Sequence, residues 1–195
     1  MTDYFSETLR IITDSLKSVD SKVFDNLSND CILTLNSDRK IVVTGLGKNV
    51  PACEKFVSTL WSLGLNAAFL HTSDATHGDL GIIRDGDLVI MLSKSGNTFE
   101  SIYLMNHLEK RNIRLWVITF NADSSLAKNT SNSLLLKIEN EGDLWNLVPN
   151  NSATVYFILL QTLTMHICEA IDVKLEVFKK NHPGGSIGVQ LNASQ

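Results

Sequence analysis

The sequence predicts an α/β protein of three layers, in which a sheet of parallel strands lies between two layers of helices. Short, continuous apolar runs alternate with longer amphipathic segments from residue 40 to residue 171. Such runs are typical of parallel strands that are buried on both faces. The 195 residues contain no linker, low-complexity segment or charge block, so we expect one domain over residues 1–195.

The amino-terminal segment, residues 3–36, is predicted to be helical. Phe5, Leu9, Ile12 and Leu16 recur at three- and four-residue steps, which marks one apolar face of a helix. Further apolar residues continue this pattern more loosely: Val23, Leu27, Ile32 and Leu33. We therefore expect N-terminal helices before the α/β core.

The α/β core is predicted over residues 38–171. Its first strand, Lys40–Thr44, is a β-branched run that ends at Gly45. The later strands are expected at 67–70, 88–92, 114–119 and 133–138, and the helices at 50–63, from 97, as a turn at 124–127, and at 149–171.

The last two segments differ sharply in composition. The apolar stretch 153–167 is interrupted by Gln161, Thr162, Thr164 and His166 and is shorter than the ~20 residues of a membrane span, so a buried core helix is expected. The tail, residues 172–195, becomes polar and glycine-rich from residue 181 onward.

Charge and cysteine content narrow the function classes. A net charge of −4 disfavours a protein that coats nucleic acid or an anionic membrane. Cys31, Cys53 and Cys168 are odd in number and widely separated, which indicates free thiols in a reducing compartment. The start of the chain lacks a secretory signal pattern. We therefore expect a cytoplasmic protein with no nucleic-acid or membrane partner.

The stretch SKSGNT, residues 93–98, follows a buried strand and precedes a helix. Ligands of such sheets bind at the carboxyl ends of the strands. A helix N-terminus offers free N–H groups, and here Gly96 and three hydroxyl groups (Ser93, Ser95 and Thr98) accompany it. The stretch therefore favours a phosphate-binding turn. The alternative is a helix with an ordinary Ser/Thr cap.

The first loop reads GLGKN, residues 45–49. It is not the dinucleotide fingerprint, because Val50 stands where that motif has its third glycine, and the spacing of a P-loop is also absent. Lys48 could hold a phosphate or neutralise an oxyanion. It could equally be a solvated surface charge.

The loop HTSDATHGDLG, residues 71–81, contains a histidine among small and turn-forming residues. His77 could move protons near neutral pH, or it could bond to the backbone for structural reasons. We expect no metal site, because no two His, Cys, Asp or Glu residues stand at ligand spacing on one element.

Together these loops resemble the sugar isomerase (SIS) domain family, and within it the D-arabinose 5-phosphate isomerase branch. The matching motifs occur in the family's order across roughly residues 35–190: GLGK at 45–48, HGDLG at 77–81, SKSGNT at 93–98 followed by Glu100, Glu141 in its acidic loop, and HPGGSIG at 182–188.

The resemblance implies a five-stranded parallel sheet in flavodoxin-like order and a homotetramer with active sites shared between subunits. It implies interconversion of D-ribulose 5-phosphate and D-arabinose 5-phosphate, toward the eight-carbon sugar acid of lipopolysaccharide and some capsules, without a cofactor or metal. The implied catalytic residues are Lys48, His77, Glu100, Glu141 and His182, and the implied phosphate-binding residues are Gly47, Ser93, Lys94, Ser95, Gly96 and Thr98.

Three of these roles have plain structural alternatives. Glu100 could be an exposed first-turn glutamate favoured by the helix dipole, and Glu141 a solvated charge. His182 can reach a site only if the tail folds back or crosses to another subunit. The alternative for His182 is a disordered tail.

The chain also departs from the family pattern. It ends soon after HPGGSIG, so we expect the regulatory CBS (cystathionine β-synthase-type) modules of many relatives to be missing. Asn150 and Asn151 replace Thr and Ser of a Pro-Thr-Ser-Ser motif, which puts one phosphate or sugar contact in doubt. Asn97 replaces a common glutamate, with little expected effect.

Two other functions remain open. One is another sugar-phosphate isomerase, acting on a hexulose 6-phosphate or a heptose phosphate, although HPGGSIG weighs against it. The other is a non-catalytic sugar-phosphate sensor. Regulators of that kind usually carry a helix-turn-helix module, and residues 1–36 are too few and too acidic for one.

Overall fold

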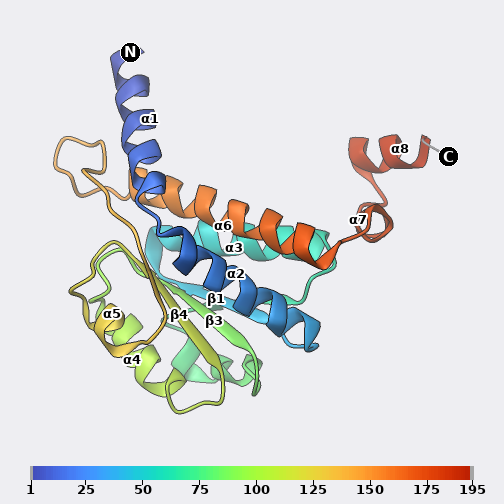
Figure 1. Ribbon diagram of the computed structural model, residues 1–195, viewed down its shortest axis with the longest axis horizontal. Coiled ribbons are helices and arrows are strands. Elements are labelled where there is room, and N and C mark those ends of the chain that lie inside the picture. Colours follow the sequence, from blue (N-terminus) through green and yellow to red (C-terminus); the bar gives the residue numbers. More distant parts are fainter. Residues whose placement is uncertain (1, 194–195) are drawn as a thin grey trace.

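The computed structural model describes residues 2–193 and contains a sheet of five parallel strands (Figure 1). The strands are β1 (Ile41–Gly45), β2 (Ala67–His71), β3 (Leu88–Leu92), β4 (Arg114–Thr119) and β5 (Ser133–Leu135), in the order β2-β1-β3-β4-β5. The order reverses between β1 and β3, where Ile41 pairs with both Ala67 and Leu88. The predicted fold class and its flavodoxin-like strand order are confirmed.

Helices cover both faces of the sheet (Figure 1). One layer holds α1 (Thr2–Lys17), α2 (Ser21–Asn36), α3 (Val50–Ser62) and α6 (Asn151–Ile171), and the other holds α4 (Phe99–Leu108) and α5 (Ser125–Asn129). Side chains alternate between the two layers along each strand: Val43 and Ile90 pack under the first, and Val42 and Val89 under the second. This period of two explains why the strands are apolar throughout.

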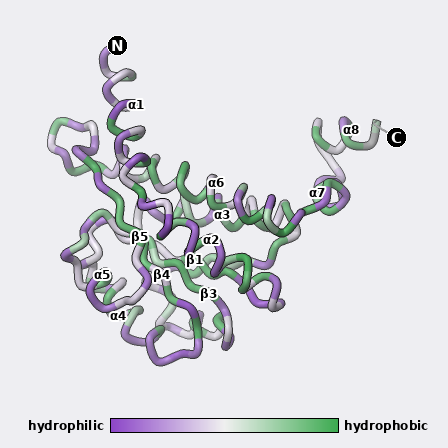
Figure 2. The backbone as a smooth tube through the Cα atoms, viewed as in Figure 1, coloured by the Kyte–Doolittle hydropathy of each residue, from purple (hydrophilic) through white to green (hydrophobic). Residues whose placement is uncertain are grey.

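Helix α6 is the central helix of the first layer. It is long and apolar enough to cross a membrane by length and composition, yet it packs on α1, α2 and α3. Tyr156, Leu160 and Leu163 on α6 are almost completely buried in the core. Figure 2 shows apolar residues gathered in the strands and along α6. The expected core helix is therefore present.

Some elements differ from their predicted bounds. The helical segment 3–36 divides into α1 and α2, because Asp20 caps α2 by accepting hydrogen bonds from Lys22 N and Val23 N. β5 is shorter than predicted. Between β2 and β3 the chain forms two short 3₁₀ helices, η2 (Ala75–His77) and η3 (Asp79–Ile82). A third, η1 (Gly47–Asn49), follows β1.

The tail contains more regular structure than its composition suggests. It forms α7 (Leu175–Asn181) and α8 (Gly185–Ala193), which project from the body beyond α6 (Figure 1). Asn181 Nδ2 donates to the carbonyl groups of Trp61 and Ser62 at the C-terminal end of α3. These contacts fix where the tail leaves the body.

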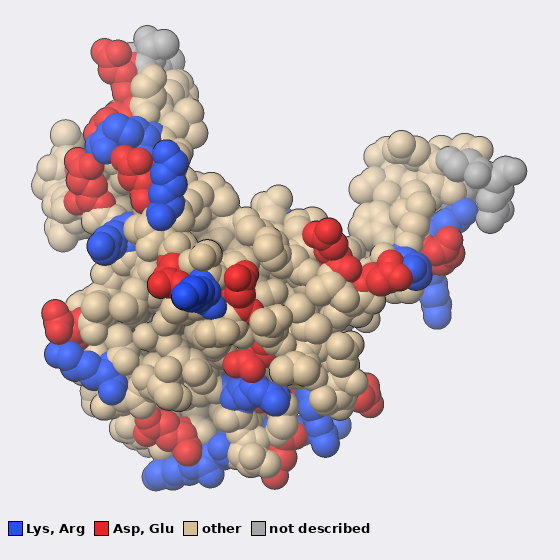
Figure 3. Space-filling view, viewed as in Figure 1, with Lys and Arg blue, Asp and Glu red and all other residues tan. Residues whose placement is uncertain are grey.

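The charged surface is mixed. Figure 3 shows Lys and Arg lying among Asp and Glu over the visible face, without an extended area of one sign. At the amino end, Arg10 on α1 pairs with Glu139 in the loop after β5, and Tyr4 donates to Gly142 O in the same loop. The loop and α1 therefore stand together on one side of the molecule (Figure 1).

Candidate active site

A cavity of about 450 Å³ lies at the carboxyl ends of β1 and β3. This is the point where the strand order reverses, which is where open α/β sheets bind their ligands. The predicted residues that line the cavity are Gly47, Lys48, Ser93, Lys94, Ser95 and Thr98, and the residues that complete it are Leu46, Asn49, Leu92, Ser101 and Pro149. The structure therefore brings the first loop and the SKSGNT stretch into one site.

The SKSGNT turn is shaped by its own hydroxyl groups. Ser93 Oγ accepts a hydrogen bond from Gly96 N, and Ser95 Oγ accepts one from Asn97 N and lies 3.4 Å from Thr98 Oγ1. Thr98 is the residue before α4, and within the described chain its side chain makes no capping hydrogen bond. The first-turn amides of α4 are thus left without a side-chain cap, as an anion-binding helix terminus requires.

Two glycines shape the site for different reasons. Gly96 has φ +61°, and a Cβ there would lie 2.2 Å from Ser124 Oγ, so glycine allows the turn to pack on the start of α5. Gly47 has φ +59° with open space around its Cβ position. Gly47 lines the cavity and lets the backbone turn there. Gly96 is buried and does not line the cavity, so it contributes through its packing against Ser124.

Asn49 was not predicted to belong to the site. Its Nδ2 donates to Leu92 O at the end of β3, at 3.2 Å. This bond ties the first loop to the neighbouring strand and sets the position of Lys48, which precedes it. The only signal in the sequence was the amide group next to Lys48, and an amide in a loop is too common to single out.

Lys94 and Glu141 form an ion pair at the edge of the cavity. Lys94 Nζ lies 2.5 Å from Glu141 Oε1, and the Glu141 side chain is completely buried whereas that of Lys94 is 38% exposed. The same carboxylate accepts hydrogen bonds from Ser152 Oγ at 2.6 Å, Ser152 N at 2.9 Å and Asn150 N at 3.1 Å. Glu141 is therefore a buried acceptor for the N-terminus of α6, and the solvated charge considered as an alternative is excluded.

The bonds around Glu141 determine its protonation. Burial acts to raise the pKa of Glu141, but the hydrogen bonds from Lys94 and Ser152 outweigh it and hold that pKa below its ordinary value. The carboxylate is thus stabilised as an anion. Ser152 was not predicted as a site residue, because its partner Glu141 lies in a separate loop.

The two asparagines that depart from the family pattern turn toward the acidic loop. Asn151 is buried, and its Nδ2 donates to Asn140 O at 3.1 Å. Asn150 gives its backbone N–H to Glu141. Pro149 lines the cavity, but neither asparagine does.

His77 and Glu100 lie outside the cavity wall. His77 ends η2 and is exposed, in a loop that Thr72 N joins to Gly45 O at the end of β1. Glu100 is exposed in the first turn of α4, two residues after Thr98. Both residues therefore stand at the same edge of the sheet as the cavity.

His182 lies at the opposite edge of the sheet. Its neighbour Asn181 contacts the last turn of α3, whereas the first turn of α3 follows the cavity residue Asn49. At 1.5 Å per residue, this helix separates the two places by ~20 Å. The His182 ring stacks on Phe178 at 3.9 Å, and its Nδ1 donates to Phe178 O. Within one chain His182 does not reach the cavity.

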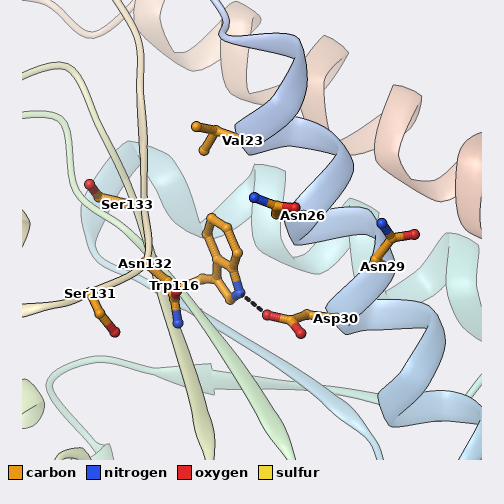
Figure 4. A pocket seen from close by; sticks show the side chains of 8 residues that line it. All are labelled: Val23, Asn26, Asn29, Asp30, Trp116, Ser131, Asn132 and Ser133. Carbon is orange, nitrogen blue, oxygen red and sulfur yellow. Dashed lines mark hydrogen bonds between the residues drawn. The ribbon is translucent and has the colours of Figure 1, made fainter.

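A second, polar cavity of about 330 Å³ lies between α2 and the strands β4 and β5 (Figure 4). In it Trp116 Nε1 donates to Asp30 Oδ2 at 2.9 Å, and the remaining lining is mostly Asn and Ser. None of the predicted site residues lies there. Among residues 2–193, no group of three His, Cys, Asp or Glu side chains is placed to hold a metal ion.

Comparison with known proteins connects this geometry to a family. Over 184 residues the chain is 34% identical to an arabinose 5-phosphate isomerase, KdsD, of Pseudomonas aeruginosa, covering 94% of this chain and 56% of the relative. A KdsD of Francisella tularensis is 30% identical over 188 residues, covering 95% and 58% respectively. The chain thus spans little more than half the length of these relatives.

A solved structure shares the fold. A protein of Escherichia coli CFT073 in complex with arabinose 5-phosphate superposes with a TM-score of 0.83 at 29% identity, covering 92% of this chain and 94% of that one. Residues 34–182 match the SIS domain, which is most of the chain and includes every residue of the cavity. The resemblance inferred from the motifs is confirmed at this level: the chain belongs to the SIS domain family.

Proposed function

We propose that the chain is an aldose–ketose isomerase that interconverts D-arabinose 5-phosphate and D-ribulose 5-phosphate. The observation that carries this proposal is the cavity lined by Lys48, a hydroxyl-rich turn and the uncapped N-terminus of a helix. Such a set of donors suits a phosphate dianion. The similarity to KdsD isomerases and to a protein in complex with arabinose 5-phosphate supports the choice of pentose.

The reaction moves two protons and needs no external oxidant or reductant. From the aldose, a base removes the proton on C2 to give an enediolate, and the proton then returns to C1 while a hydroxyl proton moves from O2 to O1. We assign the base to Glu100 or Glu141 and the transfer between oxygens to His77 and His182. Lys48 stabilises negative charge on the oxyanion or the phosphate.

The site is completed by a second copy of the chain, in a homo-oligomer that we take to be a tetramer. His182 supplies its ring to a neighbouring cavity, because it cannot reach its own. Exposed apolar side chains on the tail support a contact between copies: Leu175, Val177, Ile187 and Val189. More of them lie on α1 and the loop after β5: Tyr4, Phe5, Leu9, Leu144, Trp145 and Leu147. Apolar surface of this extent is typical of interfaces.

We place the enzyme in the cytoplasm, where its product would feed synthesis of an eight-carbon sugar acid for lipopolysaccharide or capsule. Two alternatives are retained: an isomerase of hexulose 6-phosphates or heptose phosphates, and a sugar-phosphate sensor. The sensor needs only the phosphate-binding cavity, whereas the isomerase also needs His77 and the two glutamates.

An exchange experiment separates these functions. The purified chain is incubated with arabinose 5-phosphate in D₂O and followed by ¹H NMR, with hexulose 6-phosphate and heptose phosphate in parallel. Formation of ribulose 5-phosphate, with solvent deuterium entering at the exchanged carbon, is the expected result. Conversion of another sugar phosphate alone would support the second isomerase. Tight binding without any conversion would support the sensor.

A further inference from the structure

Glu141 and Lys94 lie at the boundary between the cavity and the first turn of α6. Lys94 lines the cavity, and Glu141 does not. The carboxylate is fully buried and contacts the Lys94 ammonium group, so of the two side chains only that of Lys94 is exposed. A group that takes a proton from a carbon atom must reach that atom. In this arrangement the ammonium group reaches the ligand and the carboxylate reaches the ammonium group.

The hydrogen bonds of Glu141 leave it little capacity for another partner. Its Oε1 accepts from Lys94 Nζ and Ser152 Oγ, and its Oε2 accepts from the backbone N–H groups of Asn150 and Ser152. Both oxygens are thus occupied twice. A carboxylate stabilised as an anion in this way, with a lowered pKa, is also a weak base.

Lys94 gains a fixed position from the same contacts. A lysine side chain that is 38% exposed would otherwise sample many rotamers, with a considerable entropy cost on ordering. The 2.5 Å contact with a carboxylate that is itself anchored on α6 holds the ammonium group at the cavity wall. Its remaining donors are free to face an anionic ligand.

From this geometry we propose that Glu141 is a positioning residue, which acts through Lys94 and is not the base of the reaction. Lys94 is the group that contacts the phosphate or the oxyanion, and Ser152 holds Glu141 in turn. This inference rests on the proposed function. Neither glutamate lines the cavity, but Glu100 is exposed at the same edge of the sheet, so of the two it is the candidate for the base.

Kinetics of two Glu141 variants test the role. Glu141→Gln keeps one oxygen that can accept from Lys94 Nζ and Ser152 Oγ, but it places an NH₂ group opposite the backbone N–H groups of Asn150 and Ser152. In a variant shown by circular dichroism to be folded, we expect kcat within about 10-fold of wild type and an unchanged acidic limb in the pH profile of kcat/KM. Glu141→Ala removes the acceptor and should lose more. A loss of about 10²–10⁴-fold in kcat for Glu141→Gln, with the acidic limb abolished and KM unchanged, would identify Glu141 as the base and overturn the proposal.

A binding cycle tests the coupling without turnover. Calorimetry with inorganic phosphate is carried out on wild type, Lys94→Met, Glu141→Gln and the double variant, each checked for folding by circular dichroism. We expect Glu141→Gln to change the phosphate dissociation constant by about threefold or more only when Lys94 is present. An equal change with and without Lys94 would contradict the proposal. If wild type converted no sugar phosphate, the proposed function would be wrong. The binding cycle would still test whether Glu141 affects phosphate affinity through Lys94.

Discussion

The two ends of α3 lie beside two different parts of the candidate site, the cavity and His182. At its start, the cavity is built from two adjacent loops of one chain, with hydrogen bonds from Asn49 Nδ2 to Leu92 O and from Gly96 N to Ser93 Oγ holding it together. At its end, His182 rests on Phe178 beside exposed apolar residues. Both loops of the cavity, which we call the binding half, come from one chain, whereas in the proposed function His182 comes from a second copy.

The difference follows from the fold. The carboxyl ends of parallel strands converge at one edge, so residues in successive loops meet there without further help. A tail that leaves from the opposite edge cannot join them in the same chain. Binding should therefore withstand loss of the tail contacts, whereas turnover should not.

Removal of either histidine should separate turnover from binding most clearly. We expect His77→Ala and His182→Ala each to lower kcat by about 10²–10⁴-fold, because each removes a proton-transfer group. Phosphate affinity should stay within about threefold of wild type, since neither residue lines the cavity. Steady-state kinetics and calorimetry provide the two readouts. His166→Asn, exposed on α6, is the control.

Near wild-type turnover in His77→Ala would remove that residue from the mechanism. Near wild-type turnover in His182→Ala would mean that the tail is not part of the site.

Gly96→Ala tests whether the stability of the binding half depends on the close packing of Gly96 against Ser124. The new Cβ would meet Ser124 Oγ at 2.2 Å in a left-handed conformation, so we expect a loss of roughly 2–5 kcal/mol in the free energy of unfolding. Urea denaturation measures it. Gly81→Ala, with open space and no positive φ, should change stability little, and equal losses in both variants would argue against a tightly packed turn.

Lys48→Met tests the charge in the cavity. Loss of a charged donor to phosphate is worth about 1.5–3 kcal/mol, so we expect the KM for arabinose 5-phosphate to rise about 10–100-fold. Initial-rate measurements at several substrate concentrations give the value. Lys110→Met, an exposed lysine beyond the end of α4, is the matched control, and an unchanged KM in Lys48→Met would exclude it from ligand binding.

The smallest expected effect is the contribution of Glu141, at the edge of the binding half, to the free energy of unfolding at acidic pH. The pKa of Glu141 in the folded chain lies below the ordinary 4.5, so its contribution to stability is present above that pH and is lost as the pH falls through the lowered pKa. Wild type should therefore lose free energy of unfolding more steeply than Glu141→Gln below about pH 4.5. Urea titrations at a series of pH values measure both slopes. Parallel slopes would show that the carboxylate is not stabilised by folding.

The sequence predicted the parts of the molecule that depend on local patterns. Buried parallel strands are apolar along their whole length, which located all five of them, and turn residues after β1 and β3 located the cavity. The sequence predicted N-terminal helices over 3–36 without placing the break between them, because a cap residue such as Asp20 within a long apolar pattern gives a weak signal.

The remaining features depend on contacts between distant segments. No spacing rule connects Glu141 with Lys94 and Ser152, because the three residues come from different loops and a helix terminus. The family motifs predicted that Glu141 and His182 matter, yet only the fold shows that one is buried in contact with Lys94 and the other lies at the far end of α3.

Mixing two inactive variants tests the shared site most directly. His77→Ala and His182→Ala chains are unfolded together, refolded as mixed oligomers and assayed with arabinose 5-phosphate. Random assembly pairs an intact cavity with an intact partner tail in about a quarter of the sites, so about a quarter of wild-type turnover should return. Turnover no greater than the sum of the separate variants would show that each chain completes its own site, and would contradict the division between the two ends of α3.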